Sequence, residues 1–262
     1  MNKILSVKGL NYKAIFKDLN LNIEKNTFNL VTGSNKSGKT TLIKILSGII
    51  EVKDTCFYNS SDITKLKSLE FATTFSYVIF NGNFNFTFST LNQELLYQLD
   101  KVNLTSSERK MKYKHLVKIF ELDNYMYEDI NNLSYFNKIK GLVMCSVVKG
   151  PKVLLLDNIL DDLSDGEGQE IIVSLKRIGG MTVIIGADRL NLSPLFDYVH
   201  VIDKGEIILS GNPFEVLKED STLNKIGLSL PFMVDLSLKL KYYGLIDDIV
   251  LDMNRMVDSL WK

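Results

Sequence analysis

The chain has 262 residues, of which 45% are hydrophobic, so it can form one large domain, or one and a half, around a sizeable core. Lys plus Arg and Asp plus Glu both number 31, a balance that gives no electrostatic reason to expect nucleic acid or an anionic membrane as partner. The two cysteines, Cys56 and Cys145, make neither a disulfide framework nor a metal site, which fits a reducing cytoplasm, and no apolar run approaches the ~20 residues of a membrane span.

Strands dominate the first third of the chain. The segment Met1–Lys8 is too short and too polar to be a signal peptide, so we expect any membrane role to come through a partner. Alternating apolar and polar residues and short apolar runs predict strands at 3–8, 18–24, 28–32, 56–58 and 75–80. Residues 41–47 have the spacing of an amphipathic helix.

Helical spacing begins near residue 90 and continues to 148. The expected helices are 91–99, 106–122 and 134–148. After them come a strand at 152–157, a helix near 165–177, strands at 182–186, 198–203 and 206–210, and renewed helical spacing from Pro213. Strands that alternate with helices predict an α/β fold, in which we interpret the helical block as an insertion.

A glycine-rich loop joins the strand at 28–32 to the helix that follows it. Gly33 is followed by four residues and then by Gly38-Lys39-Thr40, which is a phosphate-binding pattern. Its backbone N–H groups and the positive end of the helix would face a nucleotide polyphosphate, with the Lys39 charge at the β- and γ-phosphates and the Thr40 hydroxyl on Mg²⁺. The other predicted binding residues of the loop are Ser34, Asn35, Lys36, Ser37 and Thr41.

Two points about this loop stay open. An ordinary glycine-rich turn between a strand and a helix is the alternative interpretation of the pattern. Lys36 either adds a phosphate contact or is a solvated side chain.

A second motif, Val153–Asp157, strengthens the nucleotide hypothesis. An apolar strand that ends in Asp places a carboxylate at the sheet edge, where Asp157 can hold the Mg²⁺ that Thr40 also contacts. The separation of 118 residues between Lys39 and Asp157 is too long for a minimal kinase or GTPase and fits an inserted helical subdomain. A GTPase would also need an Asn-Lys-x-Asp motif, which the sequence lacks.

Together these motifs resemble the ATP-binding subunits of ABC transporters over essentially the whole chain. Leu133-Ser134 stands where that family has its signature, Tyr12 matches its adenine-stacking aromatic, and Val199–Pro213 is similar to its closing hairpin. The segment Ile226–Gly244 is similar to the C-terminal segment of the energy-coupling-factor branch.

The resemblance implies a P-loop NTPase fold of the ABC type. It has a RecA-like core, an N-terminal antiparallel β subdomain, a helical subdomain at about 86–150 within an ATP-binding domain at 1–212, and a C-terminal helical extension at 213–262. It also implies ATP and Mg²⁺ as cofactors, a second ATP-binding subunit and a transmembrane coupling subunit as partners, and a peripheral position on the cytoplasmic face of the membrane. Neither nucleic acid binding nor direct insertion into the bilayer is expected.

The departures from the family pattern fall at positions that carry hydrolysis. The catalytic carboxylate is replaced by Asn158, whose neutral amide cannot accept a proton from water. The switch histidine is replaced by Asp188, which would face the γ-phosphate with like charge, and the lid glutamine is replaced by Phe80. The two signature glycines are Tyr135 and Phe136, whose rings should hinder close approach to a partner's nucleotide.

Some further residues are assigned only by default. The two histidines, His115 and His200, lie away from the motifs and are interpreted as structural. Phe84, Phe86 and Phe88 alternate along the chain, and they either line a groove for the coupling protein or form a strand face packed on the core.

We therefore expect a chain that binds MgATP and hydrolyses it poorly or not at all, within an importer of vitamins or transition-metal ions. One alternative is a catalytically silent subunit paired with an active paralogue. The other is a non-transport ABC protein of repair or translation, although the tandem cassettes or long coiled coils of such proteins are absent from the sequence.

Overall fold

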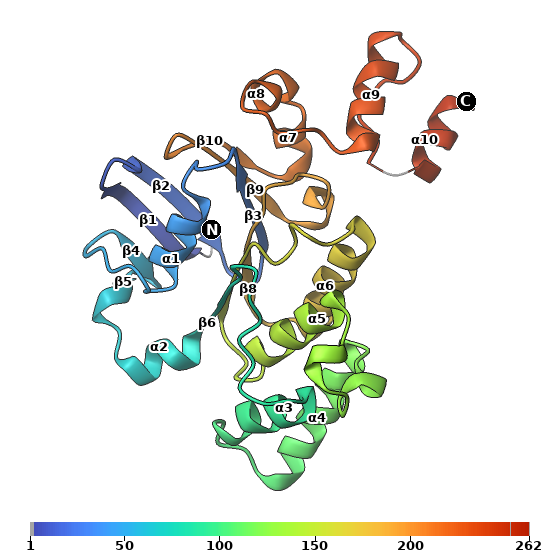
Figure 1. The fold of residues 1–262 in the computed structure, drawn as a ribbon. Coiled ribbons are helices and arrows are strands. Elements are labelled where there is room, and N and C mark those ends of the chain that lie inside the picture. Colours follow the sequence, from blue (N-terminus) through green and yellow to red (C-terminus); the bar gives the residue numbers. More distant parts are fainter. Residues whose placement is uncertain (1–2, 252, 262) are drawn as a thin grey trace.

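Two β-sheets enclose the helix that follows the phosphate-loop sequence in the computed structural model, which describes residues 3–251 and 253–261 (Figure 1). The strands are β1 (Lys3–Tyr12), β2 (Phe16–Glu24), β3 (Phe28–Gly33), β4 (Cys56–Tyr58), β5 (Ser61–Asp62), β6 (Phe75–Ile79), β7 (Val153–Asp157), β8 (Thr182–Gly186), β9 (Tyr198–Asp203) and β10 (Glu206–Gly211). The helices are α1 (Lys39–Leu46), α2 (Ser68–Thr74), α3 (Leu91–Asp100), α4 (Ser106–Ile119), α5 (Tyr135–Ser146), α6 (Asp165–Ile178), α7 (Pro213–Leu217), α8 (Asp220–Lys225), α9 (Phe232–Tyr242) and α10 (Met253–Leu260). The outer ends of the two predicted domains, Met1 and Lys262, lie outside the described residues.

The smaller sheet is antiparallel and has the strand order β2-β1-β4-β5. The burial along β2 follows the alternation of apolar and polar residues in its sequence. Leu19, Leu21 and Ile23 are buried, and the polar residues between them are exposed. Both β1 and β2 run further than predicted and include most of the expected loop between residues 8 and 18. Irregular register along this pair interrupts the period of two, so the pattern could not reveal the full length of the strands.

The larger sheet has the order β10-β9-β3-β8-β7-β6, and only β10 runs antiparallel to its neighbour. Its central strands β3, β7 and β8 are buried along their whole length, as expected for parallel strands covered on both faces. The pairing register aligns the ends of four strands at one edge of the sheet. Asp157 of β7 pairs with Ile79 of β6 on one side and with Gly186 of β8 on the other. Gly186 in turn pairs with Val31 of β3. The residues that follow these four strands therefore lie at the same edge of the sheet.

Helix α1 lies between the two sheets, where Leu42, Ile43, Ile45 and Leu46 are fully buried (Figure 1). Burying each of these side chains contributes roughly 1.5–3 kcal/mol, so both sheets hold the helix in place. The helix begins two residues earlier than predicted, because Gly38 serves as its N-cap and Lys39 already has helical geometry. This early start brings the N-terminus of the helix directly behind the phosphate-loop sequence.

A second hydrophobic core covers the opposite face of the large sheet, under α3, α4, α5 and α6. The predicted helices of the 90–148 block are confirmed, with α4 ending three residues early and α5 beginning after Ser134 as its N-cap. Residues 83–89 do not form a strand, which was one of the two alternatives for their alternating aromatics. Phe84 and Phe86 still pack against this core, whereas Phe88 is 37% exposed.

The tail from Pro213 is helical, as the spacing predicts, and its described residues, 213–251 and 253–261, form the short helices α7, α8, α9 and α10 beyond β10 (Figure 1). The Ser237 hydroxyl of α9 accepts a hydrogen bond from the Val250 N–H at 3.0 Å and so ties α9 to the segment before α10. None of the helices in residues 3–251 and 253–261 is both long and apolar enough to cross a bilayer.

Candidate nucleotide-binding site

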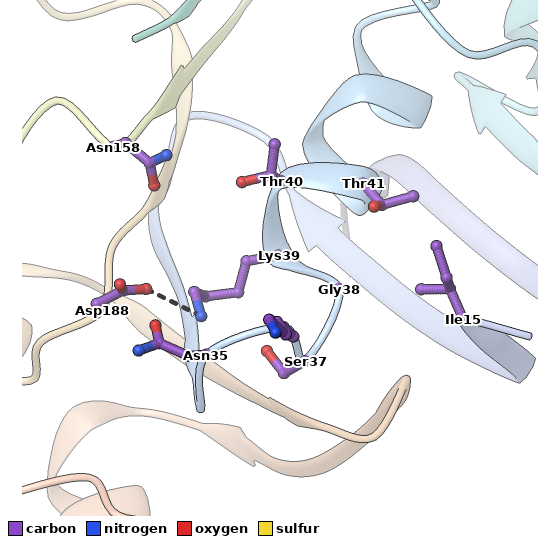
Figure 2. Close-up of a pocket in the computed structure, with 10 residues that line it drawn as sticks. Ile15, Asn35, Ser37, Gly38, Lys39, Thr40, Thr41, Asn158 and Asp188 are labelled. Atoms are coloured by element: carbon purple, nitrogen blue, oxygen red, sulfur yellow. Dashed lines mark ion pairs between the residues drawn. The ribbon is translucent and has the colours of Figure 1, made fainter. Parts of the chain in front are cut away.

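A cavity of about 490 Å³ opens at the edge where β3, β7 and β8 end, in front of α1 (Figure 2). The loop before α1 provides one wall of this cavity, and the residues after β7 and β8 provide the other. The lining residues are Ile15, Asn35, Lys36, Ser37, Gly38, Lys39, Thr40, Thr41, Asn158 and Asp188. The structure thus brings most of the predicted loop residues together with two of the predicted catalytic positions.

Two glycines let the loop take its shape. A Cβ on Gly33 would lie 1.9 Å from the carbonyl oxygen of Ile202, so no side chain fits at this close approach. Gly38 has φ +113°, and a Cβ there would meet the ring of Phe16 at 2.6 Å. Lys36 also has a positive φ, of 64°, and it is exposed at the rim of the cavity.

The β9–β10 hairpin supports the loop from behind, a role that the sequence analysis missed. The Ser34 hydroxyl donates to the Asp203 carboxylate at 2.9 Å, and the Gly205 N–H donates to the Ser37 carbonyl at 3.1 Å. Gly205 packs tightly, since a Cβ there would lie 1.7 Å from the Ile15 carbonyl oxygen. The strands predicted at 198–203 and 206–210 leave Lys204 and Gly205 between them as a turn, but the contact of this turn with the loop depends on the pairing of β9 with β3.

The Lys39 ammonium group makes three polar contacts. It donates to the carbonyl oxygens of Gly33 and Ser34 at 2.8 and 2.9 Å, and it forms an ion pair of 2.9 Å with the Asp188 carboxylate. The two carbonyl contacts fold the lysine side chain back over its own loop. Its positive charge is thereby held at the floor of the cavity, with the side chain only 7% exposed.

Asp157 is fully buried at the end of β7, and within the described part of the chain neither of its carboxylate oxygens has a hydrogen-bond partner. Burial raises its pKa to about 6, although the nearby Thr40 hydroxyl and the charge of Lys39 act in the opposite direction. A buried, unpartnered carboxylate beside a hydroxyl is a donor set that suits a hard cation such as Mg²⁺. The residues present therefore fit that ion.

Phe80, at the first position after β6, does not reach the cavity. It is 5% exposed, its N–H donates to the Asp157 carbonyl at 3.1 Å, and its ring packs edge-on against Tyr135 at 6.0 Å between centroids. Phe84 contacts both rings, at 5.1 Å from Phe80 and 5.4 Å from Tyr135. These aromatic rings join the end of β6 to the start of α5.

Ser134 and Tyr12 also lie outside the cavity lining. The Ser134 hydroxyl caps α5 by accepting the Asn137 N–H, and it lines a separate hollow with Tyr135, Phe136, Asp162 and Glu167. The Tyr135 hydroxyl donates to Asp162 at 3.2 Å across this hollow. Tyr12 is the last residue of β1, and it is half-buried with the Lys13 ammonium over its ring. Ile15, and not Tyr12, lines the cavity.

A sequence model described as ABC transporter matches residues 16–161, which is more than half of the chain. The chain belongs to the ABC transporter family. Its fold is accordingly the ABC-type P-loop NTPase fold that the sequence motifs predict.

Similarity to named relatives covers more of the chain than the matched domain. The energy-coupling factor transporter ATP-binding protein EcfA2 of Clostridium perfringens is 27% identical over 246 residues, which cover 87% of this chain and 84% of the relative. EcfA1 of Mesomycoplasma hyopneumoniae is 25% identical over 258 residues, covering 95% and 91%. The solved structure of CbiO1 from Clostridium perfringens, described as part of the ABC transporter complex CbiONQ, superposes with a TM-score of 0.77 at 23% identity, covering 93% and 98%.

In this ABC family member, both histidines lie away from the cavity, as the sequence predicts. His115 is exposed on α4. His200 is buried in β9, where Nε2 faces the Asn29 side-chain oxygen at 3.2 Å and Nδ1 faces the Ser210 hydroxyl at 2.8 Å. The Asn29 amide nitrogen donates elsewhere, so its oxygen accepts from Nε2–H, and burial lowers the pKa of His200 to about 4. The buried histidine is therefore neutral and structural.

Proposed function

We propose that this chain is the ATP-binding subunit of an energy-coupling-factor importer that takes up a vitamin or a transition-metal ion. The two named relatives are ATP-binding proteins of energy-coupling factor transporters, and CbiO1 is part of a transporter complex. By this analogy the chain lies on the cytoplasmic face of a membrane, with a second ATP-binding subunit and a transmembrane coupling subunit as partners. In our proposal residues 1–212 bind ATP, with the helical subdomain near 86–150, and residues 213–262 form an extension.

One observation carries the proposal: the Gly33–Thr41 loop forms a cavity wall at the N-terminus of α1, with the buried Lys39 charge at its floor. Backbone N–H groups at a helix start and a fixed ammonium are the groups that hold nucleotide polyphosphate. Tyr12 would stack on adenine at the open end. Ser134, in its separate hollow, would face the nucleotide of a partner subunit.

The same proposal assigns Mg²⁺ to Asp157 and Thr40. The buried Asp157 carboxylate, without a hydrogen-bond partner in residues 3–251 and 253–261, supports this assignment. When bound, Mg²⁺ supplies positive charge that neutralises phosphate oxygens. The protein residues contribute a single carboxylate and a hydroxyl, and Mg²⁺ typically completes its shell with phosphate oxygens and water.

Hydrolysis in this site is slow or absent in our proposal, for three reasons of side-chain chemistry. Asn158 reaches the cavity but has no basic group, and loss of a general base typically costs ~10²–10⁴ in rate. Asp188 is paired with Lys39 instead of providing an imidazole. Phe80 is part of the core and brings no polar group to the cavity.

A test combines calorimetry and turnover on the purified chain. Titration with MgATP should give heats of binding, and turnover should stay below about 1 s⁻¹. If calorimetry detects no nucleotide uptake with Mg²⁺ present, the proposal fails.

The ion pair between Lys39 and Asp188 favours a second candidate, a catalytically silent subunit that holds nucleotide beside an active paralogue. Isolation of the native complex from membranes would identify its members. An intact ATP-binding paralogue beside a membrane coupling protein supports the silent role, and two copies of this chain support the first candidate. Ribosomes or DNA in the complex would instead indicate a non-transport ABC protein.

A further inference from the structure

The Lys39 ammonium has three N–H groups, and the structure gives each one an acceptor: the carbonyls of Gly33 and Ser34, and the carboxylate of Asp188. The first two acceptors belong to the loop itself and stabilise its fold. Asp188 is the acceptor that lines the cavity, and Figure 2 shows its ion pair with Lys39. A phosphate oxygen that contacts Lys39 must therefore displace this carboxylate or share the lysine with it.

The chain holds Asp188 in this place through its backbone. The Asp188 N–H donates to the Asp161 carboxylate at 2.8 Å, and the preceding Ala187 N–H donates to the Val31 carbonyl of β3 at 3.1 Å. Asp188 is the second residue after the buried strand β8, and its side chain lines the cavity at this end of the sheet. Its side chain is 46% exposed there, which leaves its charge facing the solvent-filled space in front of Lys39.

The charges around Lys39 do not act equally on all parts of a nucleotide. The backbone of a phosphate loop cradles the α- and β-phosphates, whereas its lysine reaches the β- and γ-phosphates. Asp188 therefore competes mainly with the γ-phosphate. The Asp161 carboxylate accepts the Asp188 N–H, so a second negative charge lies behind Asp188, outside the cavity lining.

We propose that Asp188 makes this site selective for nucleoside diphosphates over triphosphates, because its carboxylate holds the position on Lys39 that a γ-phosphate would take. The inference rests on the proposed function, since it requires that the Gly33–Thr41 loop binds nucleotide. It adds a ligand preference: the chain holds MgADP more tightly than MgATP. The subunit then favours the product state of the nucleotide.

The test is calorimetry of MgADP and MgATP with the full chain and with Asp188→Asn, which keeps the size of the side chain and removes its charge. The wild-type chain should bind MgADP about tenfold more tightly than MgATP. Asp188→Asn should tighten MgATP binding about tenfold and MgADP binding less than threefold. Asp235→Asn is the matched control, because it removes the same charge from an exposed Lys239–Asp235 pair on α9, and it should change neither affinity.

The outcomes separate the inference from the function on which it rests. If Asp188→Asn shifts both affinities equally, or shifts neither, the inference is wrong and nucleotide binding stands. If neither nucleotide binds to the wild-type chain, both the inference and the proposed function fail. Should the variant not fold, the wild-type comparison alone decides, because MgATP binding as tight as MgADP binding overturns the preference.

Discussion

The phosphate loop and the positions around it that carry hydrolysis in the ABC family have different structural roles in this chain. The loop is shaped by backbone geometry, with Gly33 and Gly38 packed too closely for any side chain and the β9–β10 hairpin bonded behind it. The hydrolytic positions depend on side chains, and here those side chains pack in the core, as Phe80 does, or pair with Lys39, as Asp188 does. In our proposal the fold therefore keeps the backbone geometry for binding nucleotide, while substitutions at Asn158, Asp188 and Phe80 remove the side chains for hydrolysis.

We expect the largest effect from a substitution of Phe80, which stands in place of the family's lid glutamine. This variant tests whether the Phe80 side chain belongs to the core. Phe80→Ala should lower the free energy of unfolding by about 4 kcal/mol, because it leaves a cavity between Phe84 and Tyr135. Urea unfolding followed by circular dichroism measures this change. Phe232→Ala, on a ring that is 69% exposed, is the control and should cost less than about 0.5 kcal/mol. Equal small losses in both variants would mean that Phe80 does not support the core.

The next largest effect is expected for nucleotide binding by the phosphate loop. Lys39→Ala removes the buried charge at the cavity floor and should weaken MgATP binding about 100-fold, or roughly 3 kcal/mol, since hydrogen bonds to charged groups are worth ~1.5–3 kcal/mol. Calorimetry gives the dissociation constants. Lys36→Ala, at the exposed rim, is the matched control with an expected loss below about tenfold. A Lys39→Ala variant that binds as well as the wild type would contradict the assigned cavity.

A third experiment examines the buried histidine outside both regions. Burial lowers the pKa of His200 to about 4, so between pH 6.5 and 4 the unfolded chain binds a proton that the folded chain does not. This group should therefore remove about 2 kcal/mol of stability as the pH falls from about 7 to 5. Asp157, with its pKa raised to about 6, acts in the opposite sense, because there the folded state binds the extra proton.

The His200 contribution is isolated by comparing unfolding free energies of the wild type and His200→Gln at the two pH values. The variant should lose less stability on acidification than the wild type. His115→Gln, on the exposed face of α4, should follow the wild-type profile. Parallel profiles for wild type and His200→Gln would show that the buried imidazole does not titrate as proposed.

The smallest effect concerns the signature position at the start of α5. Tyr135→Phe removes a hydroxyl that donates to Asp162 at 3.2 Å, and it should cost roughly 0.5–1 kcal/mol of unfolding free energy. Thermal unfolding reports the change, with Tyr242→Phe on an exposed ring as control. An unchanged midpoint would mean that water replaces this bond without loss.

Much of the fold was predictable because its periodic patterns are strong. The alternation in β2, the apolar runs of β3, β7 and β8, and the spacing of α3–α6 all match the structure within a few residues. Helix α2 was missed because only Thr74 of its seven residues is buried, which leaves no apolar stripe to recognise. The alternation of Phe84, Phe86 and Phe88 left open a groove for the coupling protein or a strand face on the core, and in the structure Phe84 and Phe86 pack on the core from an irregular segment.

The candidate site was predictable only where a local motif encodes it. The loop residues and Asp157 follow from short patterns, whereas the contacts of Asp203 and Gly205 with the loop depend on how distant strands pair. The sequence placed Asp188 against a phosphate, yet its ion pair with Lys39 became visible only when the end of β8 was seen beside the loop. The contact of Phe80 with Tyr135 likewise joins segments 55 residues apart.

The most direct test of the account is ATP turnover by the purified chain, measured on the same sample for which calorimetry has shown MgATP binding. We expect saturable binding together with turnover below about 1 s⁻¹. Turnover at or above that rate, abolished by Lys39→Ala, would contradict it.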